Sequence, residues 1–202
     1  MPVPEEPIAI VGRGCAVPGA LDPDAFWANV AAGRCELVPG DGYGRVRGFD
    51  ARFDPTGFQL DPDALTPLDP LFHWVLHAGR QALREAGYTT EPKPFGGLVI
   101  GNLSYPTTGL AGLAERVWRG DDPRDGRDRF SSGLPAHLAA RALGLGRGGF
   151  ALDAACASAL YAISIACDRL RDRAADLMLA GAVSRSDRRL ISGGFRALGA
   201  SS

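Results

Sequence analysis

Lysine is almost absent from this sequence: Lys93 is the only lysine among 22 basic residues, and the others are arginines scattered along the chain. These 22 basic residues are balanced by 23 acidic ones, which leaves a net charge of −1 over 202 residues. A near-neutral chain without a basic cluster lacks the electrostatic footprint of nucleic-acid binding or of attachment to an anionic membrane. We therefore expect no nucleic acid and no membrane as a partner.

Long apolar runs and paired cysteines are missing too. Charged residues such as Asp153 and Asp168 interrupt the most apolar stretch, residues 151–170, so no segment reaches the roughly 20 apolar residues of a transmembrane helix. The N-terminus has no basic region followed by an apolar one, so we expect no secretory signal. None of the four cysteines is spaced as C-x-x-C, which argues against zinc, thioredoxin-like sites and a disulfide framework. These absences predict a cytoplasmic protein that binds no metal.

Segments typical of strands and of helices alternate along the chain, whose 46% hydrophobic and 22% charged residues are typical of a globular domain. Short apolar runs predict buried strands at residues 7–12, 95–101, 149–155 and 176–183. Apolar periodicity and capping residues predict helices at residues 22–33, 67–86, 107–118, 134–143 and 157–171. This alternation predicts an α/β fold, with a mixed, mainly parallel sheet and helices on both faces. Residues 121–129, rich in alternating charges, are expected to form a mobile loop.

The longest expected helix, residues 67–86, carries a pair of histidines. We expect Thr66 to cap its N-terminus and Gly87 to end it. His73 and His77 are four residues apart and share a stripe with two arginines, Arg80 and Arg84. Positive neighbours disfavour a divalent cation, so we expect a solvated or interface face here rather than a metal site.

A glycine pair near the N-terminus, Gly12-Arg13-Gly14, follows the first expected strand as in a dinucleotide-binding fingerprint. A G-x-G-x-x-G motif would need a third glycine where Val17 stands, and Pro18 interrupts the helix that should begin there. A structural turn is therefore the better interpretation of this segment.

Cys156 is the candidate nucleophile. An apolar strand leads to it and a helix is expected to begin directly after it, so its sulfur should lie at a strand-to-helix corner. Free amide groups and the positive end of the helix dipole stabilise a thiolate at such a corner. The neighbouring residues are almost all alanine or serine, which leaves room for a bulky thioester. The alternative is a buried cysteine that acts as a small hydrophobe, and we interpret Cys15, Cys35 and Cys167 in that structural way.

The residues around Cys156 resemble a known active-site motif. Residues 153–160, Asp-Ala-Ala-Cys-Ala-Ser-Ala-Leu, are similar to the D-T-A-C-S-S-S-L motif of β-ketoacyl synthases, with alanine in place of one threonine and two serines. Other stretches that resemble the family occur in the family's order: residues 6–19 followed by Phe26-Trp27, Leu68-Asp69-Pro70 followed by residues 82–87, and residues 175–183. Together they resemble the ketosynthase domains of type I polyketide and polyunsaturated-fatty-acid synthases.

The resemblance implies a thiolase-like fold, of which residues 1–202 would be the truncated N-terminal half. It implies that Cys156 takes an acyl group and that condensation with a malonyl thioester follows, in fatty-acid or polyketide synthesis. The implied partner is an acyl carrier protein domain, whose phosphopantetheine carries the thioesters, so that no cofactor binds the chain directly. A homodimer is implied for the full-length protein.

The family also uses two histidines, in H-G-T-G-T and K-x-x-x-G-H motifs, and neither motif occurs in this sequence. His73, His77 and His137 lie in other contexts, and Lys93 stands between two prolines. We therefore expect this chain alone to be inactive in condensation. Two alternatives remain open: a non-catalytic dimerising or carrier-protein-binding module, and a Rossmann-like binding domain.

Overall fold

The computed structural model describes residues 6–37, 44–49, 51–89, 91–121 and 131–199. At its centre lies a sheet of three parallel strands, β1 (Gly96–Asn102), β2 (Gly149–Leu152) and β3 (Leu177–Val183), in the order β2-β1-β3. The middle strand β1 is buried along its whole length. The predicted parallel strands are thus confirmed in this part of the chain.

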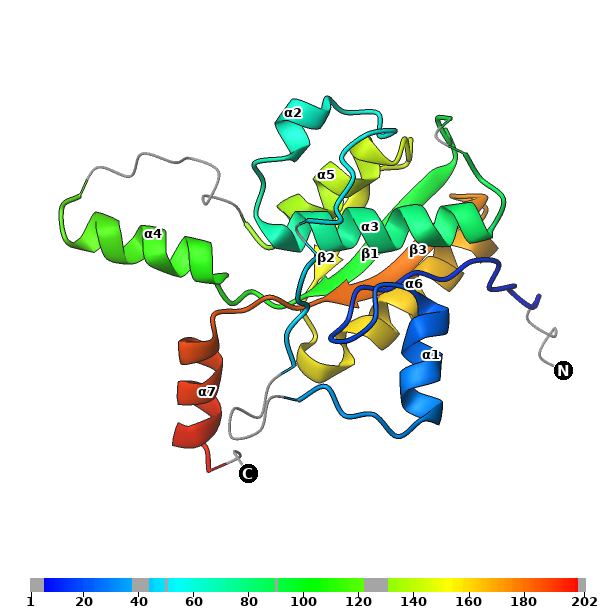
Figure 1. Ribbon diagram of the computed structural model, residues 1–202. Coiled ribbons are helices and arrows are strands. Elements are labelled where there is room, and N and C mark those ends of the chain that lie inside the picture. The colour runs from blue at the N-terminus through cyan, green and yellow to red at the C-terminus, as the bar shows by residue number, and fades with distance from the viewer. Residues whose placement is uncertain (1–5, 38–43, 50, 90, 122–130, 200–202) are drawn as a thin grey trace, which may run out of the picture.

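Helices cover both faces of this sheet (Figure 1). On one face, α3 (Pro70–Glu85) and α5 (Leu134–Ala142) pack against the strands and against each other, and α6 (Ser158–Arg171) packs on the other face. Alternate residues of β1 separate the two layers: Leu98 and Ile100 join the core beneath α3 and α5, whereas Gly101 faces Ser158 of α6. The predicted arrangement of helices on both faces is confirmed.

Four shorter segments complete the described chain: α1 (Pro23–Ala31), α2 (Pro62–Leu65), α4 (Thr108–Trp118) and α7 (Arg188–Ala197). α1 is capped by Asp22 and α4 by Thr107, as the sequence predicts. α7 occupies a segment that was not expected to be helical, and Asp187 caps it. α4 and α7 extend away from the end of the sheet at which the strands finish (Figure 1).

The start of α3 differs from the sequence prediction. Thr66 does not cap the helix, because Asp69 accepts a hydrogen bond from the Leu71 N–H at 2.8 Å and Pro70 takes the first helical position. The predicted end is confirmed, since Gly87 follows the helix with φ of 81°, a conformation that glycine adopts without steric cost.

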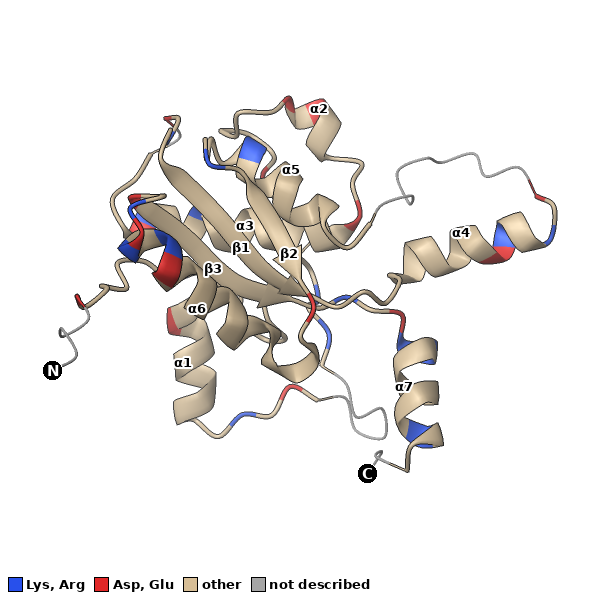
Figure 2. Ribbon diagram, turned by 180° about the vertical axis from the view of Figure 1, so that it is seen from behind, with Lys and Arg blue, Asp and Glu red and all other residues tan. Residues whose placement is uncertain are grey.

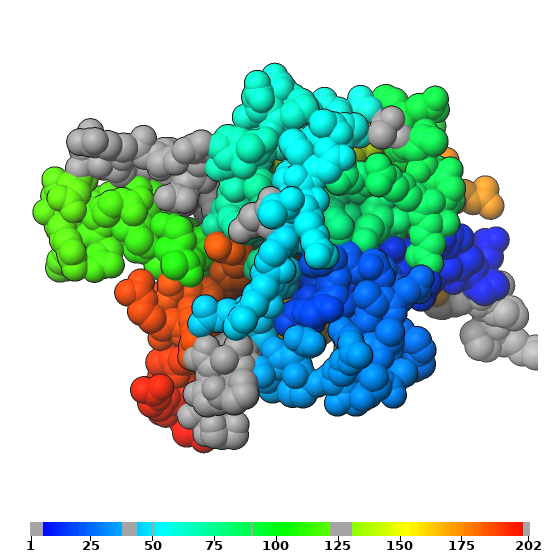
Figure 3. All heavy atoms as spheres, viewed as in Figure 1, coloured from blue at the N-terminus to red at the C-terminus, as the bar shows by residue number. Residues whose placement is uncertain are grey.

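The prediction that His73 and His77 lie on a solvated or interface face is wrong. His73 is buried, with its Nε2 2.9 Å from the carbonyl oxygen of Leu65, and His77 Nε2 lies 2.7 Å from that of Leu21. The rings of Phe53 and Phe49 pack on these two histidines. The segment that carries these phenylalanines crosses over α3 in Figure 3, coloured cyan, which explains why the face is covered.

The predicted N-terminal strand at residues 7–12 is also not found. This segment lies in no sheet of the described chain, and Ile10 is 88% exposed. The segment after it runs alongside α3 instead: a Cβ atom at Gly12 would lie 2.0 Å from the Ala82 carbonyl oxygen, and one at Gly14 equally close to that of Ala78. The two glycines therefore permit close backbone packing on a helix.

Charges are spread over the described chain, with basic and acidic residues interspersed (Figure 2). Among the described residues, no helix is both long and apolar enough to cross a membrane. The expected mobile loop at residues 121–129 lies, beyond Asp121, outside the described residues.

Candidate active site

Cys156 lies at the corner between β2 and α6, where the sequence predicts it. β2 ends at Leu152, and the chain enters α6 through η2 (Ala155–Ala157), a short 3-10 turn of which Cys156 is the middle residue. The side chain is exposed. The predicted strand was expected to continue to Ala155, but that residue has φ of 50°, which lies in the left-handed region and breaks an extended strand.

The left-handed conformation of Ala155 is held by two side chains. Asp153 Oδ1 accepts the Ala155 N–H at 3.0 Å. Ser158 Oγ accepts the Ala154 N–H at 2.9 Å and donates to the Ala155 carbonyl oxygen at 2.7 Å. Because a residue with a Cβ atom pays a steric cost at positive φ, these three bonds stabilise a turn that alanine alone would not favour.

Asp153 also joins this turn to a distant loop. Its second oxygen, Oδ2, accepts the N–H of Ser104 at 2.8 Å, and Ser104 follows β1. Hydrogen bonds from the backbone N–H groups of Ser104 and then of Ala155 hold the pKa of Asp153 below its usual value. The carboxylate is therefore charged at neutral pH. The sequence analysis missed this role, although an aspartate directly after a strand often forms such backbone turns.

The Cys156 N–H is left without an intramolecular partner at this corner. The N–H groups of Ala154 and Ala155 bond to side chains, while Ala157 and Ser158 donate to the carbonyls of Ala154 and Ala155. Within the described chain, residues 154–158 thus pair every N–H except that of Cys156. The corner can offer one amide donor and the positive end of the α6 dipole to an anion.

The packing behind Cys156 is tight, whereas its flanks are small. A Cβ atom at Gly101 would lie 2.5 Å from Ser158 Cβ, so only glycine lets β1 approach the first turn of α6 this closely. Alanines flank Cys156 on both sides in the sequence. The corner therefore combines a firm base with little steric obstruction around the sulfur.

The other three cysteines lie in different settings. Cys167 is partly buried towards the far end of α6, and Cys35 is exposed after α1. Cys15 is partly buried, and burial, with a smaller effect of the nearby Asp22 carboxylate, raises the pKa of its thiol. The predicted structural roles of Cys15 and Cys167 agree with their partial burial, whereas Cys35 is not buried.

The histidines give no metal site in the described structure. His73 and His77 are engaged with backbone carbonyls, and His137 is exposed on α5. Among the described residues, no three His, Cys, Asp or Glu side chains are grouped so that they could hold a metal ion.

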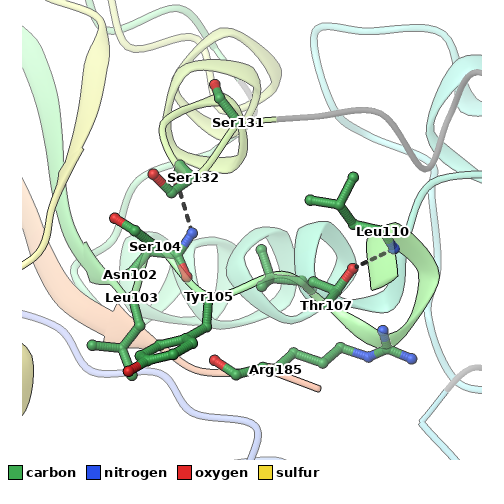
Figure 4. Close-up of a pocket in the computed structure, with 11 residues that line it drawn as sticks. Asn102, Leu103, Ser104, Tyr105, Thr107, Leu110, Ser131, Ser132 and Arg185 are labelled. Atoms are coloured by element: carbon green, nitrogen blue, oxygen red, sulfur yellow. Dashed lines mark hydrogen bonds between the residues drawn. The ribbon is translucent and has the colours of Figure 1, made fainter. Parts of the chain in front are cut away.

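A small polar cavity of about 150 Å³ lies beyond the ends of β1 and β3 (Figure 4). Its wall includes Ser104, the residue that also donates to Asp153, and Asn102, whose amide donates to the Ser132 carbonyl at 2.8 Å. Arg185 lines the cavity as well and forms an ion pair of 2.8 Å with the buried carboxylate of Asp69. Through Ser104, the cavity wall is connected to the turn that carries Cys156.

The outer side of α6 exposes large apolar side chains. Leu160 is 71% exposed, Tyr161 57% and Ile163 48%. A folded protein normally covers a contiguous apolar surface of this kind with another element or partner. The described chain provides no such cover for these three residues.

Comparison with protein families matches residues 5–202 to the model described as "Beta-ketoacyl synthase, N-terminal domain". Among curated proteins, a phenolphthiocerol/phthiocerol polyketide synthase of Mycobacterium tuberculosis has a component that is 32% identical over 211 aligned positions, which cover 89% of this chain and 13% of the relative. The mycoketide-CoA synthase of the same species is 31% identical over 89% of this chain and is matched over 5% of its own length. The chain thus spans a small part of these relatives.

Solved structures give the same picture of the fold. The ishigamide ketosynthase/chain length factor superposes with a TM-score of 0.76 at 20% identity, over 96% of this chain and 51% of that one. A ketosynthase from module 1 of the bacillaene synthase of Bacillus amyloliquefaciens gives a TM-score of 0.62 at 26% identity, over 83% of this chain and 30% of that one. The fold predicted from the sequence, part of a thiolase-like architecture, is confirmed.

Proposed function

The chain belongs to the β-ketoacyl synthase family, over that family's N-terminal domain, and we propose that it supplies the acyl-accepting cysteine of a polyketide-type condensing enzyme. The family carries out condensation in polyketide synthases. The observation that supports our assignment of the nucleophile is the position of Cys156: exposed, on a left-handed turn, directly before α6.

In the first proposed half-reaction, the Cys156 thiolate attacks the carbonyl carbon of an acyl thioester. A bond forms between Sγ and that carbon, and the bond to the leaving sulfur breaks. The proton lost by Cys156 ends on the departing thiol, so that the products are S-acyl-Cys156 and a free thiol. A covalent intermediate of this kind divides one difficult transfer into two easier ones.

The corner suits this step electrostatically. The tetrahedral intermediate places negative charge on the former carbonyl oxygen, and preorganised amide donors stabilise such an oxyanion. The Cys156 N–H is available for this purpose, because neighbouring N–H groups are already paired. The dipole of the 14-residue helix α6 favours both the attacking thiolate and the oxyanion.

In the second proposed half-reaction, a malonyl thioester loses CO2 and its carbanion attacks S-acyl-Cys156. A carbon–carbon bond forms, the sulfur–acyl bond breaks, and the Cys156 thiolate takes up a proton. Groups that stabilise the enolate are required, and the family's two histidine motifs do not occur in this sequence. We therefore propose that these 202 residues accept an acyl group but do not condense it by themselves.

The proposed partner is an acyl carrier protein domain, whose phosphopantetheine would carry both thioesters, and we propose that the full-length protein is a homodimer. A non-catalytic role in binding a partner is the second candidate. The exposed apolar side chains of α6, Leu160, Tyr161 and Ile163, favour it, since they offer a docking surface without any chemistry. The two roles differ in whether Cys156 becomes acylated.

Acyl transfer can be tested by intact-mass measurement of the protein after incubation with an acyl thioester of N-acetylcysteamine. We expect the wild type to gain one acyl group and the Cys156→Ala variant to gain none. Cys35→Ala, which removes another exposed thiol, is the matched control and should be acylated like the wild type. Equal acyl mass on the wild type and on Cys156→Ala would exclude Cys156 as the nucleophile, and no mass on either would favour the non-catalytic role.

A further inference from the structure

We propose that Asp153 and Ser158 are positioning residues for acyl transfer: they hold the peptide unit before Cys156 so that its N–H points to the forming oxyanion. This inference rests on the proposed function, in which Cys156 is the nucleophile. The two side chains, together with their bonds to residues 154 and 155, are called the turn clasp below.

The clasp acts on the residue that decides the direction of the Cys156 N–H. That N–H belongs to the peptide unit between Ala155 and Cys156, so the backbone angles of Ala155 orient it. Ala155 has φ of 50°, one of only two described non-glycine residues at positive φ. Without its restraints, an alanine would relax towards negative φ, and the peptide unit would rotate away from its present direction.

The two clasp residues restrain both sides of Ala155. Ser158 Oγ binds the Ala154 N–H and donates to the Ala155 carbonyl, which is the oxygen of the same peptide unit as the Cys156 N–H. Asp153 Oδ1 holds the Ala155 N–H. The carbonyl and the N–H of a planar trans peptide point in opposite directions, so fixing the Ala155 carbonyl also fixes the Cys156 N–H.

The clasp is anchored in the body of the fold. Asp153 Oδ2 accepts the N–H of Ser104, 49 positions away in the sequence. Ser158 is buried, and its Cβ lies where only the absence of a side chain at Gly101 makes room for it. The turn therefore cannot shift without moving the loop after β1 or the first turn of α6.

Ordinary helix capping does not explain these two residues. The position that caps α6 is Ala157, which makes no side-chain capping bond, and η2 has none either. Asp153 and Ser158 instead pair the N–H groups of residues 155 and 154, upstream of the helix. The outcome is selective, because the N–H that stays unpaired is the one beside the sulfur.

The test compares two reactions of Cys156 in four variants: Asp153→Ala, Asp153→Asn, Ser158→Ala and, as the matched control, Ser164→Ala, an exposed serine further along α6. Acylation by the N-acetylcysteamine thioester passes through an oxyanion, whereas alkylation by iodoacetamide does not. Rates at Cys156 are followed by peptide mass. Amide hydrogen exchange at residues 154–156 reports the clasp without any chemistry at the sulfur.

We expect Asp153→Ala and Ser158→Ala to slow acylation by about tenfold or more, since a misaligned oxyanion donor loses much of its effect, while alkylation changes by less than about twofold. Asp153→Asn should fall between them and the wild type, because its amide oxygen still accepts the Ala155 N–H. Ser164→Ala should match the wild type. In the wild type, the amides of Ala154 and Ala155 should exchange more slowly than that of Cys156, and Ser158→Ala should remove the protection of Ala154.

Three outcomes would overturn the inference, and they differ from one another. Unchanged acylation in the clasp variants, with an acylated wild type, refutes the positioning role alone. An equal fall in acylation and alkylation shows that the clasp only supports local folding. A wild type that is not acylated at Cys156, although its amide exchange shows the expected protection, refutes the proposed function and shows that the clasp is purely structural.

Discussion

Replacing Leu76 by alanine is expected to lower the free energy of unfolding by about 3 kcal/mol, within the 2–5 kcal/mol typical of buried leucines. Leu76 lies on α3 and is fully buried, and it belongs to the core cluster that joins this helix to the sheet and to α5. The side chains of α5 in that cluster are alanines such as Ala136 and Ala140. Their backbone already lies against β2, so the layer cannot collapse into the cavity that the truncation leaves.

The measurement is urea-induced unfolding followed by circular dichroism. Leu160→Ala is the matched control, because this leucine is 71% exposed on α6 and its truncation should change the stability by no more than about 0.5 kcal/mol. Equal losses in the two variants would show that α3 does not form the core of the protein in solution.

Replacing Asp69 by alanine is expected to cost about 3 kcal/mol, for two reasons. Asp69 caps α3 through the Leu71 N–H at 2.8 Å, and loss of such a cap costs about 1 kcal/mol. Its buried carboxylate also pairs with Arg185 at 2.8 Å. Arg185 keeps 28% of its side chain exposed, so water offsets part of the penalty for leaving this cation without a partner, which we place at about 2 kcal/mol.

Asp61→Ala provides the control for the cap alone, because Asp61 caps α2 through the Asp63 N–H at 2.9 Å and is exposed. We expect a loss of about 1 kcal/mol or less there. The double variant Asp69→Ala/Arg185→Met should lose less than the sum of its two single variants, since neither charge is then left alone. Strict additivity in urea unfolding would show that the pair makes no contribution.

The sequence predicted the central layers well because their signals are local. The three strands and the five longer expected helices all appear, and residues such as Asp22, Thr107 and Gly87 mark the ends of helices as expected. The N-terminal strand failed for the opposite reason. An apolar run such as residues 7–12 looks the same whether it pairs in a sheet or lies along a helix, and only the close approach of Gly12 to α3 distinguishes the two.

The histidine face shows the same limit. The periodicity of α3 places His73 and His77 beside arginines, which indicates a polar surface, but the phenylalanines that cover them come from an irregular segment before α2. No periodicity predicts where such a segment crosses. Tertiary packing therefore buried a stripe that local sequence assigns to solvent.

At the candidate site, the sequence located Cys156 but not its surroundings. A strand, an exposed small-residue turn and a helix can be predicted from residues 149–171, and the structure has all three. The bond from the Ser104 N–H to Asp153 joins two loops far apart in the chain, and the positive φ of Ala155 has no glycine to announce it. Both features depend on tertiary contacts, which no local pattern encodes.

The most direct test of the proposed chemistry is a competition among the four cysteines of the unaltered protein. The protein is treated with a limiting amount of an acyl N-acetylcysteamine thioester, digested, and the acyl mass is assigned to each cysteine peptide. We expect acylation at Cys156 first, little at the exposed Cys35, and least at the partly buried Cys15 and Cys167. Acylation of Cys35 before Cys156, or at equal rates, would contradict the assignment of the corner as the acyl-accepting site.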